Sequence, residues 1–346
     1  MIFYLTQFSI VGLFAYLHSY HKHEKISETA KWFCLLTLFI PSALRYGIGT
    51  DYVNYNAIFN RIMSRGFSGH TEIAWQVLNI IIGKLKLPFQ GVIIISSALT
   101  LIPLIKTAKK DFFIIIVLFS CLYYLNSYNI TRQILAMSLI WAAYLFILEK
   151  KYIHTFLLII LATLFHTSSL LFIPIFLFSE FIPLTKKRTI VLFIIFVVSF
   201  IFASNYIIPY IMKLKYSGEN FIYYSEVIIS LSKIFKAIPR FIVLFLILYF
   251  IDENKAEKRE INYIYWLILS LAISDISGMS YLIFQRIRIY CFIAYLASFK
   301  ILWLNTEKKE KIVNLFLLAF IIANYLVRFL WVGSAEVIPY TSIFTK

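Results

Sequence analysis

Charged residues are scarce in this chain of 346 residues, at 14% of the total, whereas a soluble domain carries about a quarter. Hydrophobic residues make up 61%, and the mean hydropathy is +0.82. Such a composition excludes an ordinary soluble domain. It predicts an all-α, polytopic integral membrane protein, in which residues 1–346 form a single helical membrane domain.

Cysteine is rare as well, with three residues in the whole chain. Cys34, Cys121 and Cys291 lie inside apolar runs without paired spacing, so neither a disulfide framework nor a metal site is expected. The Walker, serine-hydrolase and zinc-protease signatures are absent, and Gly47-x-Gly49 lacks the third glycine of a dinucleotide-binding motif. Nucleotide chemistry, a metal and a cofactor are therefore not expected.

A cleavable signal peptide is also missing, because the amino terminus becomes apolar at once, without a basic region or a small-residue cleavage site. It is expected to stay as the first span. About twelve spans are predicted, from the apolar runs 2–17, 31–44, 91–105, 112–126, 131–148, 152–164, 167–181, 189–209, 239–251, 261–275, 286–303 and 312–332. Segment 152–181 is expected to be either a helical hairpin or one long bent segment.

The net charge of +16 would suggest nucleic acid as the partner of a soluble chain, but here lysine gathers in short turns between the apolar runs. Cytoplasmic turns of membrane proteins have this pattern, so no nucleic acid is expected. The lysine-bearing turns are 18–31, 106–111, 149–151, 185–188, 252–260 and 305–311. With twelve spans they share the cytoplasmic side, which leaves both termini and the loops 45–90, 127–131, 210–238 and 276–285 outside.

Segment 72–87 lies within the outer loop 45–90 and predicts an amphipathic helix. Its polar residues recur every three or four positions, at Glu72, Gln76, Asn79, Gly83 and Lys86. At about 24 Å by helix rise, the segment is too short to cross the membrane. We expect a helix that lies in or dips into the outer face of the membrane, either without a catalytic role or as a wall of the site.

Arginine is distributed in the opposite way to lysine, since eight of the ten arginines are outside in this topology. Arg61 and Arg65 lie in the outer loop. The other six abut or enter predicted spans, namely Arg45, Arg132, Arg240, Arg286, Arg288 and Arg328. A guanidinium is disfavoured at mid-membrane by about 2.5 to 3.5 kcal/mol, and its planar fork binds phosphate oxygens through two hydrogen bonds. The six predict a diphosphate site at the outer face; the alternative for each is a side chain that reaches the lipid headgroups.

The longest polar passage outside the lysine turns is residues 45–55, and chemistry is expected there. Arg45 is followed by two glycines that let the backbone approach a ligand, by the carboxylate of Asp51, and by the rings of Tyr52 and Tyr55, which can bind sugar faces. The alternative is an ordinary hairpin loop whose arginine reaches the headgroups.

Four residues are candidates for a general base that accepts a proton from a hydroxyl. His166 lies at the outer tip between two short runs, and a histidine can serve as a base at neutral pH. Asp51 and Glu72 compete with it, and Asp275 is a weaker candidate. The structural alternatives are a hydrogen-bonded histidine and a carboxylate in a salt bridge.

These residues form a pattern that resembles the EpsG-like family of polysaccharide polymerases, the Wzy-type polymerases of O-antigen and exopolysaccharide. The motifs follow one another between residues 45 and 290: Arg45-x-Gly47-x-Gly49-Thr50-Asp51-Tyr52-x-x-Tyr55, Glu72 opening a helix, Arg132-Gln133-x-x-Ala136, Phe165-His166-x-Ser168 and Arg286-x-x-x-Tyr290. The chain departs from the pattern at Ala74, where a glycine is expected.

The resemblance implies a glycosyltransferase of the bacterial inner membrane that joins undecaprenyl-diphosphate-linked oligosaccharide repeats at the outer face. Membrane lipid surrounds such an enzyme, and a chain-length regulator and a flippase of the same pathway are candidate partners. Arginines would stabilise the leaving diphosphate, so no metal is required in principle. Three alternatives stay open: a flippase or transporter of lipid-linked oligosaccharide, an O-antigen ligase and a membrane acyltransferase.

Overall fold

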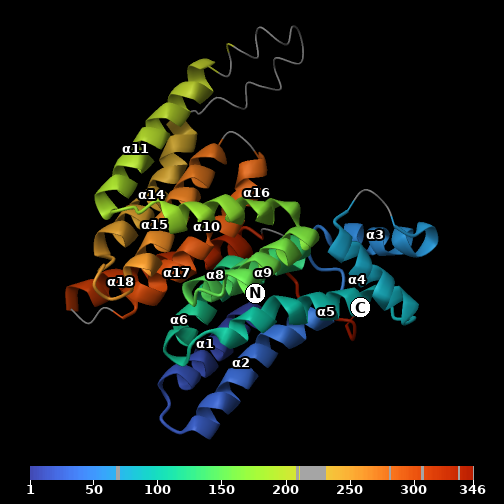
Figure 1. Ribbon diagram of the computed structural model, residues 1–346. Coiled ribbons are helices and arrows are strands. Elements are labelled where there is room, and N and C mark those ends of the chain that lie inside the picture. The colour runs from blue at the N-terminus through green and yellow to red at the C-terminus, as the bar shows by residue number, and fades with distance from the viewer. Residues whose placement is uncertain are drawn as a thin grey trace. The chain divides into compact units, whose positions relative to one another are not determined.

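The computed structural model describes residues 1–67, 71–207, 210, 231–279, 282–304, 308–333 and 336–345. Helices make up most of these residues, and no strand occurs within the described ranges (Figure 1). The prediction of a helical membrane protein is confirmed. Most of the loop predicted at 210–238 lies outside the described residues.

The chain divides into two compact units, Met1–Phe172 with Val313–Lys346 and Ile173–Ile312. The first contains α1 (Ile2–Tyr20), α2 (Glu24–Leu44), α3 (Tyr52–Arg65), α4 (Ile73–Lys84), α5 (Phe89–Leu101), the 3-10 helix η1 (Ile102–Lys106), α6 (Lys109–Phe119), the π-helix η2 (Ser120–Tyr124), α7 (Asn126–Asn129), α8 (Thr131–Leu148), α9 (Tyr152–Phe165), the 3-10 helix η3 (Thr167–Leu171), most of α18 (Lys308–Tyr325) and the π-helix η6 (Leu326–Trp331). That both units form one membrane domain stays a prediction.

The second unit contains α10 (Phe172–Phe181), α11 (Lys186–Phe202), the π-helix η4 (Ala203–Ile207), α14 (Leu231–Phe250), α15 (Lys258–Ser277), α16 (Leu282–Cys291) and α17 (Ile293–Leu302). Segment 152–181 consists of separate helical pieces, because the backbone at His166 is extended, with φ −158°, and ends α9. In the second unit, α15 packs against α11, α14, α16 and α17.

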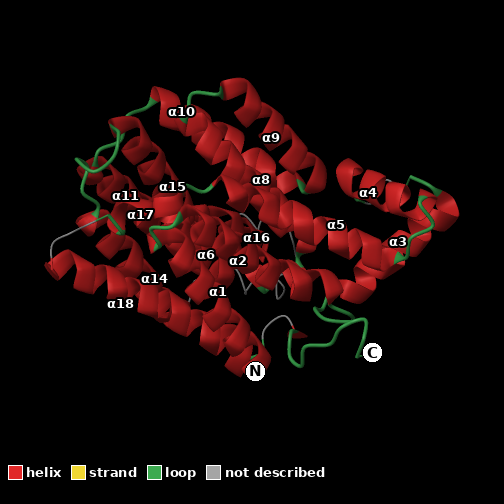
Figure 2. Cartoon of the chain, turned by 90° about the horizontal axis from the view of Figure 1, so that it is seen from below, coloured by secondary structure: helices red, strands yellow, loops and turns green. Residues whose placement is uncertain are grey.

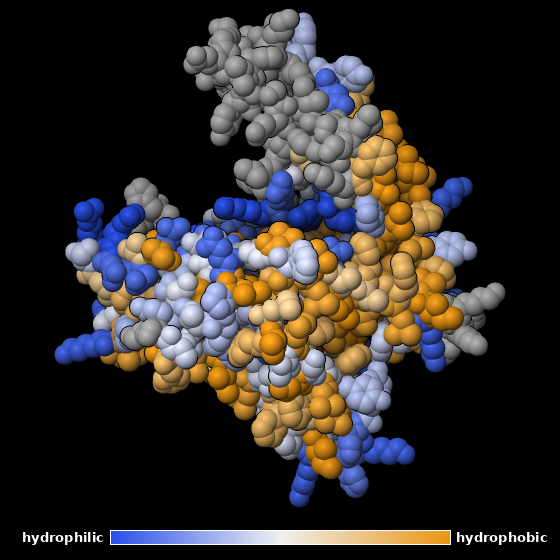
Figure 3. Space-filling view, turned by 180° about the vertical axis from the view of Figure 1, so that it is seen from behind, coloured by the Kyte–Doolittle hydropathy of each residue, from blue (hydrophilic) through white to orange (hydrophobic). Residues whose placement is uncertain are grey.

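The apolar runs of the sequence are largely helical in the described residues, but the count of twelve spans is not confirmed. Among the residues that the structure describes, five helices are long and apolar enough to cross a membrane: Ile2–Tyr20, Phe89–Lys106, Thr131–Leu148, Lys186–Ile207 and Glu310–Trp331. Other runs are divided into shorter helices, as 286–303 is into α16 and α17. Large apolar areas are exposed on the surface (Figure 3), as expected of helices that face lipid.

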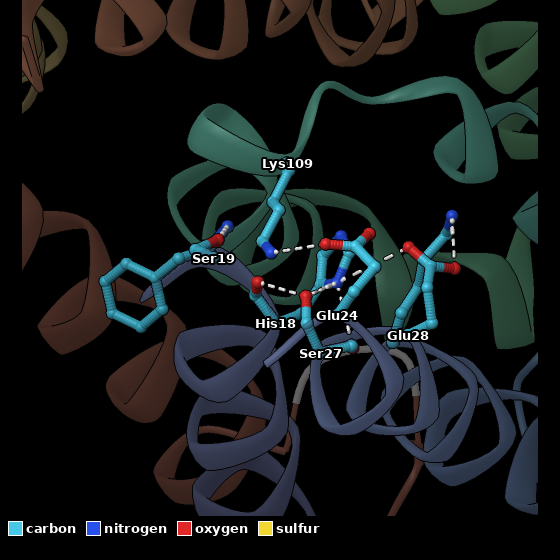
Figure 4. Close-up of polar contacts among 8 residues, drawn as sticks. His18, Ser19, Glu24, Ser27, Glu28 and Lys109 are labelled. Carbon is cyan, nitrogen blue, oxygen red and sulfur yellow. Dashed lines mark hydrogen bonds and ion pairs between the residues drawn. The ribbon is translucent and has the colours of Figure 1, made fainter. Parts of the chain in front are cut away.

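The lysine-bearing turns of the first unit share one end of it. Lys109 Nζ lies 3.3 Å from Glu24 Oε2, which joins the start of α6 to the start of α2 (Figure 4). Lys106 Nζ lies 3.3 Å from the centroid of the Phe146 ring, close to the turn 149–151. The charge pattern thus predicts the grouping of these turns.

The lysine-bearing turns of the second unit are also grouped. Lys186 Nζ donates to the backbone oxygen of Ile251 at 2.9 Å, and Lys255 Nζ lies 3.7 Å from Glu310 Oε2. These contacts link the start of α11 to the end of α14, and the turn between α14 and α15 to the start of α18. Each unit therefore has one end that is rich in lysine.

The helix predicted in segment 72–87 is present as α4, which lies beside α3 and α5 (Figure 2). Its polar stripe faces the protein: Gln76 and Asn79 are buried, and a Cβ at Gly83 would lie 1.9 Å from Met63 Sδ of α3. The exposed side is apolar at every fourth position, at Ile73, Val77, Ile81 and Leu85. This apolar ridge suits a helix that lies against lipid.

Candidate functional site

The candidate site is built around η2 and α7, which precede α8. Tyr124 Oη donates to the Leu38 carbonyl at 2.8 Å and lies 2.8 Å from Tyr128 Oη. Gln7 of α1 donates to the Tyr124 hydroxyl at 2.7 Å. These buried hydrogen bonds tie η2 to α1 and α2, and Tyr128 ties α7 to η2 directly before α8 begins.

Arg45 follows the last turn of α2 and binds to the same segment. Its Nη1 donates to the Ser42 carbonyl at 2.8 Å, and its Nη2 donates to Thr131 Oγ1 at 3.0 Å and to the Ser127 carbonyl at 3.4 Å. The guanidinium carbon lies 4.8 Å from the centroid of the Tyr128 ring. One arginine therefore joins α2, α7 and α8.

Arg45 is only 1% exposed, and its donors point at protein oxygens rather than at an open surface. Burial lowers the pKa of its guanidinium, and the nearby Tyr128 and Tyr124 oppose the fall. The sequence predicts direct contact with a ligand. In this structure Arg45 binds protein groups of α2, α7 and α8.

The polar loop that leads into α3 is held against α7. Gly49 has φ +92°, and a Cβ there would lie 2.4 Å from the Tyr128 carbonyl oxygen, so only glycine permits this approach. The Asp51 N–H donates to Asn129 Oδ1 at 3.0 Å, and the Thr50 hydroxyl donates to the same oxygen at 2.5 Å. Asp51, directly before α3, is partly exposed.

Arg132 and Glu72 form an ion pair between Nη1 and Oε2. Arg132 lies in the first turn of α8 and Glu72 directly precedes α4, and their side chains are 22% and 16% exposed. The Arg132 guanidinium carbon lies 5.6 Å from the centroid of the buried Tyr55 ring. Burial raises the pKa of the Tyr55 hydroxyl, and the charge of Arg132 opposes the rise. Arg132 thus combines a carboxylate partner with partial exposure.

Tyr52 is buried, although the sequence predicts a ring that binds sugar. Its ring packs against Tyr46 and Phe89, with centroids 5.9 and 5.3 Å away, and its Oη lies 3.5 Å from Gln90 Oε1. Tyr52 therefore anchors α3 to α5 in this structure.

His166 lies at the same end of the α8–α9 pair as Arg132. The two helices pack together and are joined by only three residues, so they run antiparallel, and Arg132 begins one while His166 directly follows the other. α4, which Glu72 precedes, also packs against α9. The structure thus brings this candidate base to the end of the unit that carries the Arg132–Glu72 pair.

A second group of charges is centred on Asp275 in the second unit. Asp275 Oδ1 lies 2.9 Å from Arg240 Nε and 3.0 Å from Arg288 Nη1. The carboxylate is buried, whereas the side chains of Arg240 and Arg288 are 35% and 20% exposed. Two guanidiniums on one carboxylate give the three residues a formal charge of +1, which suits an anionic ligand. Asp275 is the shared partner of Arg240 and Arg288. The sequence predicts it only as a weaker candidate base.

The other four arginines that the sequence predicts outside are exposed. Arg286 lies two positions from Arg288 and is exposed, so the two point to different faces of α16, as their spacing predicts. Arg328 is exposed, with its guanidinium carbon 5.1 Å from the centroid of the Phe329 ring. Arg61 and Arg65 are exposed on α3.

Sequence reasoning missed the residues that hold the first group together. Ser127, Asn129 and Thr131 supply oxygens to Arg45 and to the loop before α3. The signal for them was a short polar run between apolar ones, next to Arg132. The C-terminal segment 336–345, which binds the polar loop, gave no local signal at all.

Comparison with known proteins identifies a protein family. The model of a family described as the EpsG family matches residues 29–342, a range that includes both groups of charges. No curated protein and no solved structure matches the chain.

Proposed function

Because the chain belongs to the EpsG family, which is polysaccharide polymerase-like, we propose that it polymerises undecaprenyl-diphosphate-linked oligosaccharide repeats into O-antigen or exopolysaccharide. It is then a membrane glycosyltransferase of the bacterial inner membrane with its site on the outer face. A chain-length regulator and a flippase of the same pathway are its proposed partners. The family match does not favour the flippase, ligase or acyltransferase alternatives.

The observation that carries this proposal is the position of Arg132 on α8. This helix has 18 residues, so its ends lie about 27 Å apart, close to the thickness of the hydrocarbon. Arg132 is at one end, and the lysine turn 149–151 follows the other. If the lysines are cytoplasmic, Arg132 and Glu72 lie at the level of the outer headgroups, where the diphosphate of an outer-leaflet lipid lies.

The proposed reaction is a displacement at an anomeric carbon. A sugar hydroxyl of one lipid-linked repeat forms a bond to the anomeric carbon of the growing chain. The bond from that carbon to the diphosphate oxygen breaks, and undecaprenyl diphosphate leaves with the bonding electrons, while the hydroxyl proton passes to a base. Negative charge develops on the diphosphate, so a guanidinium beside it stabilises the transition state.

Different residues are proposed to bind the diphosphate and to accept the proton. Arg132 is partly exposed and binds the leaving diphosphate, and Arg240 and Arg288 are a second anion-binding group. Glu72 is engaged by Arg132, which leaves Asp51 and His166 as the proposed bases.

Loss of the base is expected to abolish most polymer formation. We predict that His166→Ala or Asp51→Asn lowers the rate by about a hundredfold or more, because general base catalysis contributes about 10² to 10⁴. The rate is measured with purified lipid-linked repeat at equal amounts of folded protein. If both variants form full-length polymer at the normal rate, neither residue is the base.

The topology predicts that residues 45–90 are accessible from outside the cell. The three native cysteines are buried, so an introduced cysteine can be labelled selectively. Asn54→Cys, at an exposed position of α3, should react with an impermeant maleimide in intact spheroplasts. Lys150→Cys, in the exposed turn after α8, is the control and should react only after permeabilisation. The reverse pattern would place the site on the cytoplasmic side.

The proposed activity is tested with the purified protein and lipid-linked repeat in detergent. Products longer than one repeat, with release of undecaprenyl diphosphate, support polymerisation. A ligase would transfer the repeat only to a separate acceptor such as lipid A core, and a flippase would leave the repeat unchanged.

A further inference from the structure

The C-terminal segment 336–345 lies along the polar loop that leads into the candidate site. The Tyr46 N–H donates to the Thr341 carbonyl at 3.0 Å, and the Ile343 N–H donates to the Leu44 carbonyl at 3.0 Å. The Thr341 hydroxyl also donates to the Tyr46 carbonyl, at 2.6 Å. Two stretches that are 295 positions apart thus bind each other through backbone groups, as neighbouring strands do.

The same segment is anchored to the first two helices. Tyr4 Oη of α1 donates to the Val337 carbonyl at 2.7 Å, and Tyr340 Oη donates to the Pro41 carbonyl of α2 at 3.0 Å. The Tyr340 ring stacks on Phe3, with centroids 4.2 Å apart. Helices α1 and α2 therefore anchor the segment, and the segment in turn binds the polar loop.

The polar loop meets α7 as well as this segment. Gly49 is packed on the Tyr128 carbonyl, while its N–H donates to the Glu336 carbonyl at 3.4 Å. Two residues further on, Asp51 directly precedes α3, and Tyr55 of this helix lies beside Arg132. Bonds to 336–345 and to α7 together fix where this helix starts.

We propose that residues 336–345 are a positioning element of the site. They fix residues 44–49, and through them the Asp51 carboxylate and the first turn of α3. The segment touches no reacting group, so its effect is on geometry alone. The catalytic consequence rests on the proposed polymerase function.

The hydrogen bonds can be tested without any activity. Thr341→Val removes the hydroxyl that binds Tyr46 and keeps the shape of the side chain, while Ile343→Pro removes the N–H that binds Leu44. Thr345→Val is the matched control, because the Thr345 hydroxyl is hydrogen-bonded to Ser342 of the same segment and not to the polar loop. Hydrogen exchange of residues 44–49 should be faster in the first two variants and unchanged in the control. Unchanged exchange in all three would overturn the proposal.

The positioning effect is measured as the rate of polymer formation. Ile343→Pro should lower kcat by about tenfold or more with little change in KM, since a misplaced group slows the reaction even when substrate binds. Thr341→Val should have a smaller effect in the same direction, and Thr341→Ser, which restores the hydroxyl, should recover it. Faster exchange with an unchanged kcat would show that the segment does not position the site.

A wild-type protein without polymerase activity would refute the proposed function, whereas the exchange result would still decide whether the segment holds the loop.

Discussion

Replacement of Arg132 by lysine is expected to lower polymer formation by roughly tenfold to a hundredfold. An ammonium keeps the charge and can still pair with Glu72, but it cannot make the planar two-bond contact with a diphosphate. One lost charge-assisted hydrogen bond costs about 1.5 to 3 kcal/mol, which gives this loss of rate if it is felt in the transition state. The measurement is the initial rate of polymer formation by purified protein.

Arg61→Lys is the matched control for Arg132→Lys. Arg61 is exposed on α3, so lysine there should leave the rate within about twofold and the unfolding temperature unchanged. Arg240→Lys and Arg288→Lys test the second group in the same assay. Equal rates for Arg132→Lys and Arg61→Lys would mean that Arg132 is a membrane-surface residue without a catalytic role.

Replacement of Arg45 by lysine is expected to destabilise the protein by about 3 kcal/mol. The side chain is buried, and its two terminal nitrogens bind Ser42 on one side and Ser127 and Thr131 on the other. Lysine has one nitrogen, so it would lose at least two charge-assisted bonds of about 1.5 kcal/mol each. Thermal unfolding in detergent measures the effect, with loss of polymer formation accompanying it.

Thr131→Val separates a structural role of Arg45 from direct ligand binding. It removes one acceptor of Arg45 and leaves the arginine in place, so it should destabilise the protein in the same direction by about 1 kcal/mol. If Arg45→Lys instead unfolds at the wild-type temperature but loses activity, Arg45 contacts the ligand directly, as the sequence alone predicts.

The helical architecture could be predicted from the sequence because burial in lipid requires apolar residues along the whole helix. Runs such as 131–148 coincide with helices, and the separation of lysine from arginine predicts which ends of the helices group together. Breaks within runs could not be predicted. The division of 286–303 into α16 and α17, for example, is marked by no glycine or proline in the run.

The short helix α3 was also missed, since it lies in a polar segment whose apolar positions are buried only through tertiary packing. Phe59 and Ile62 are buried in the protein, while Asn54 and Arg61 on the same helix are exposed. A search of the sequence for membrane spans does not detect such a helix.

The candidate site was predicted in part. Arg132, Glu72 and Tyr55 do lie together, and His166 lies at the same end of the α8–α9 pair. The sequence could not show which arginine side chains are already hydrogen-bonded to oxygen atoms of the protein. Nor could it show the pairing of residues 44–46 with 341–343, because backbone hydrogen bonds between distant segments leave no local pattern in the side chains.

The length distribution of the surface polysaccharide in a strain that lacks this protein tests the central proposal most directly. A polymerase supplies every linkage between repeats, so the deletion strain should carry molecules with a single repeat and no longer ladder. The wild-type chain should restore the ladder, and Arg132→Lys should restore it only weakly. Full-length polysaccharide in the deletion strain, or the complete absence of even one repeat, would contradict the assignment as a polymerase.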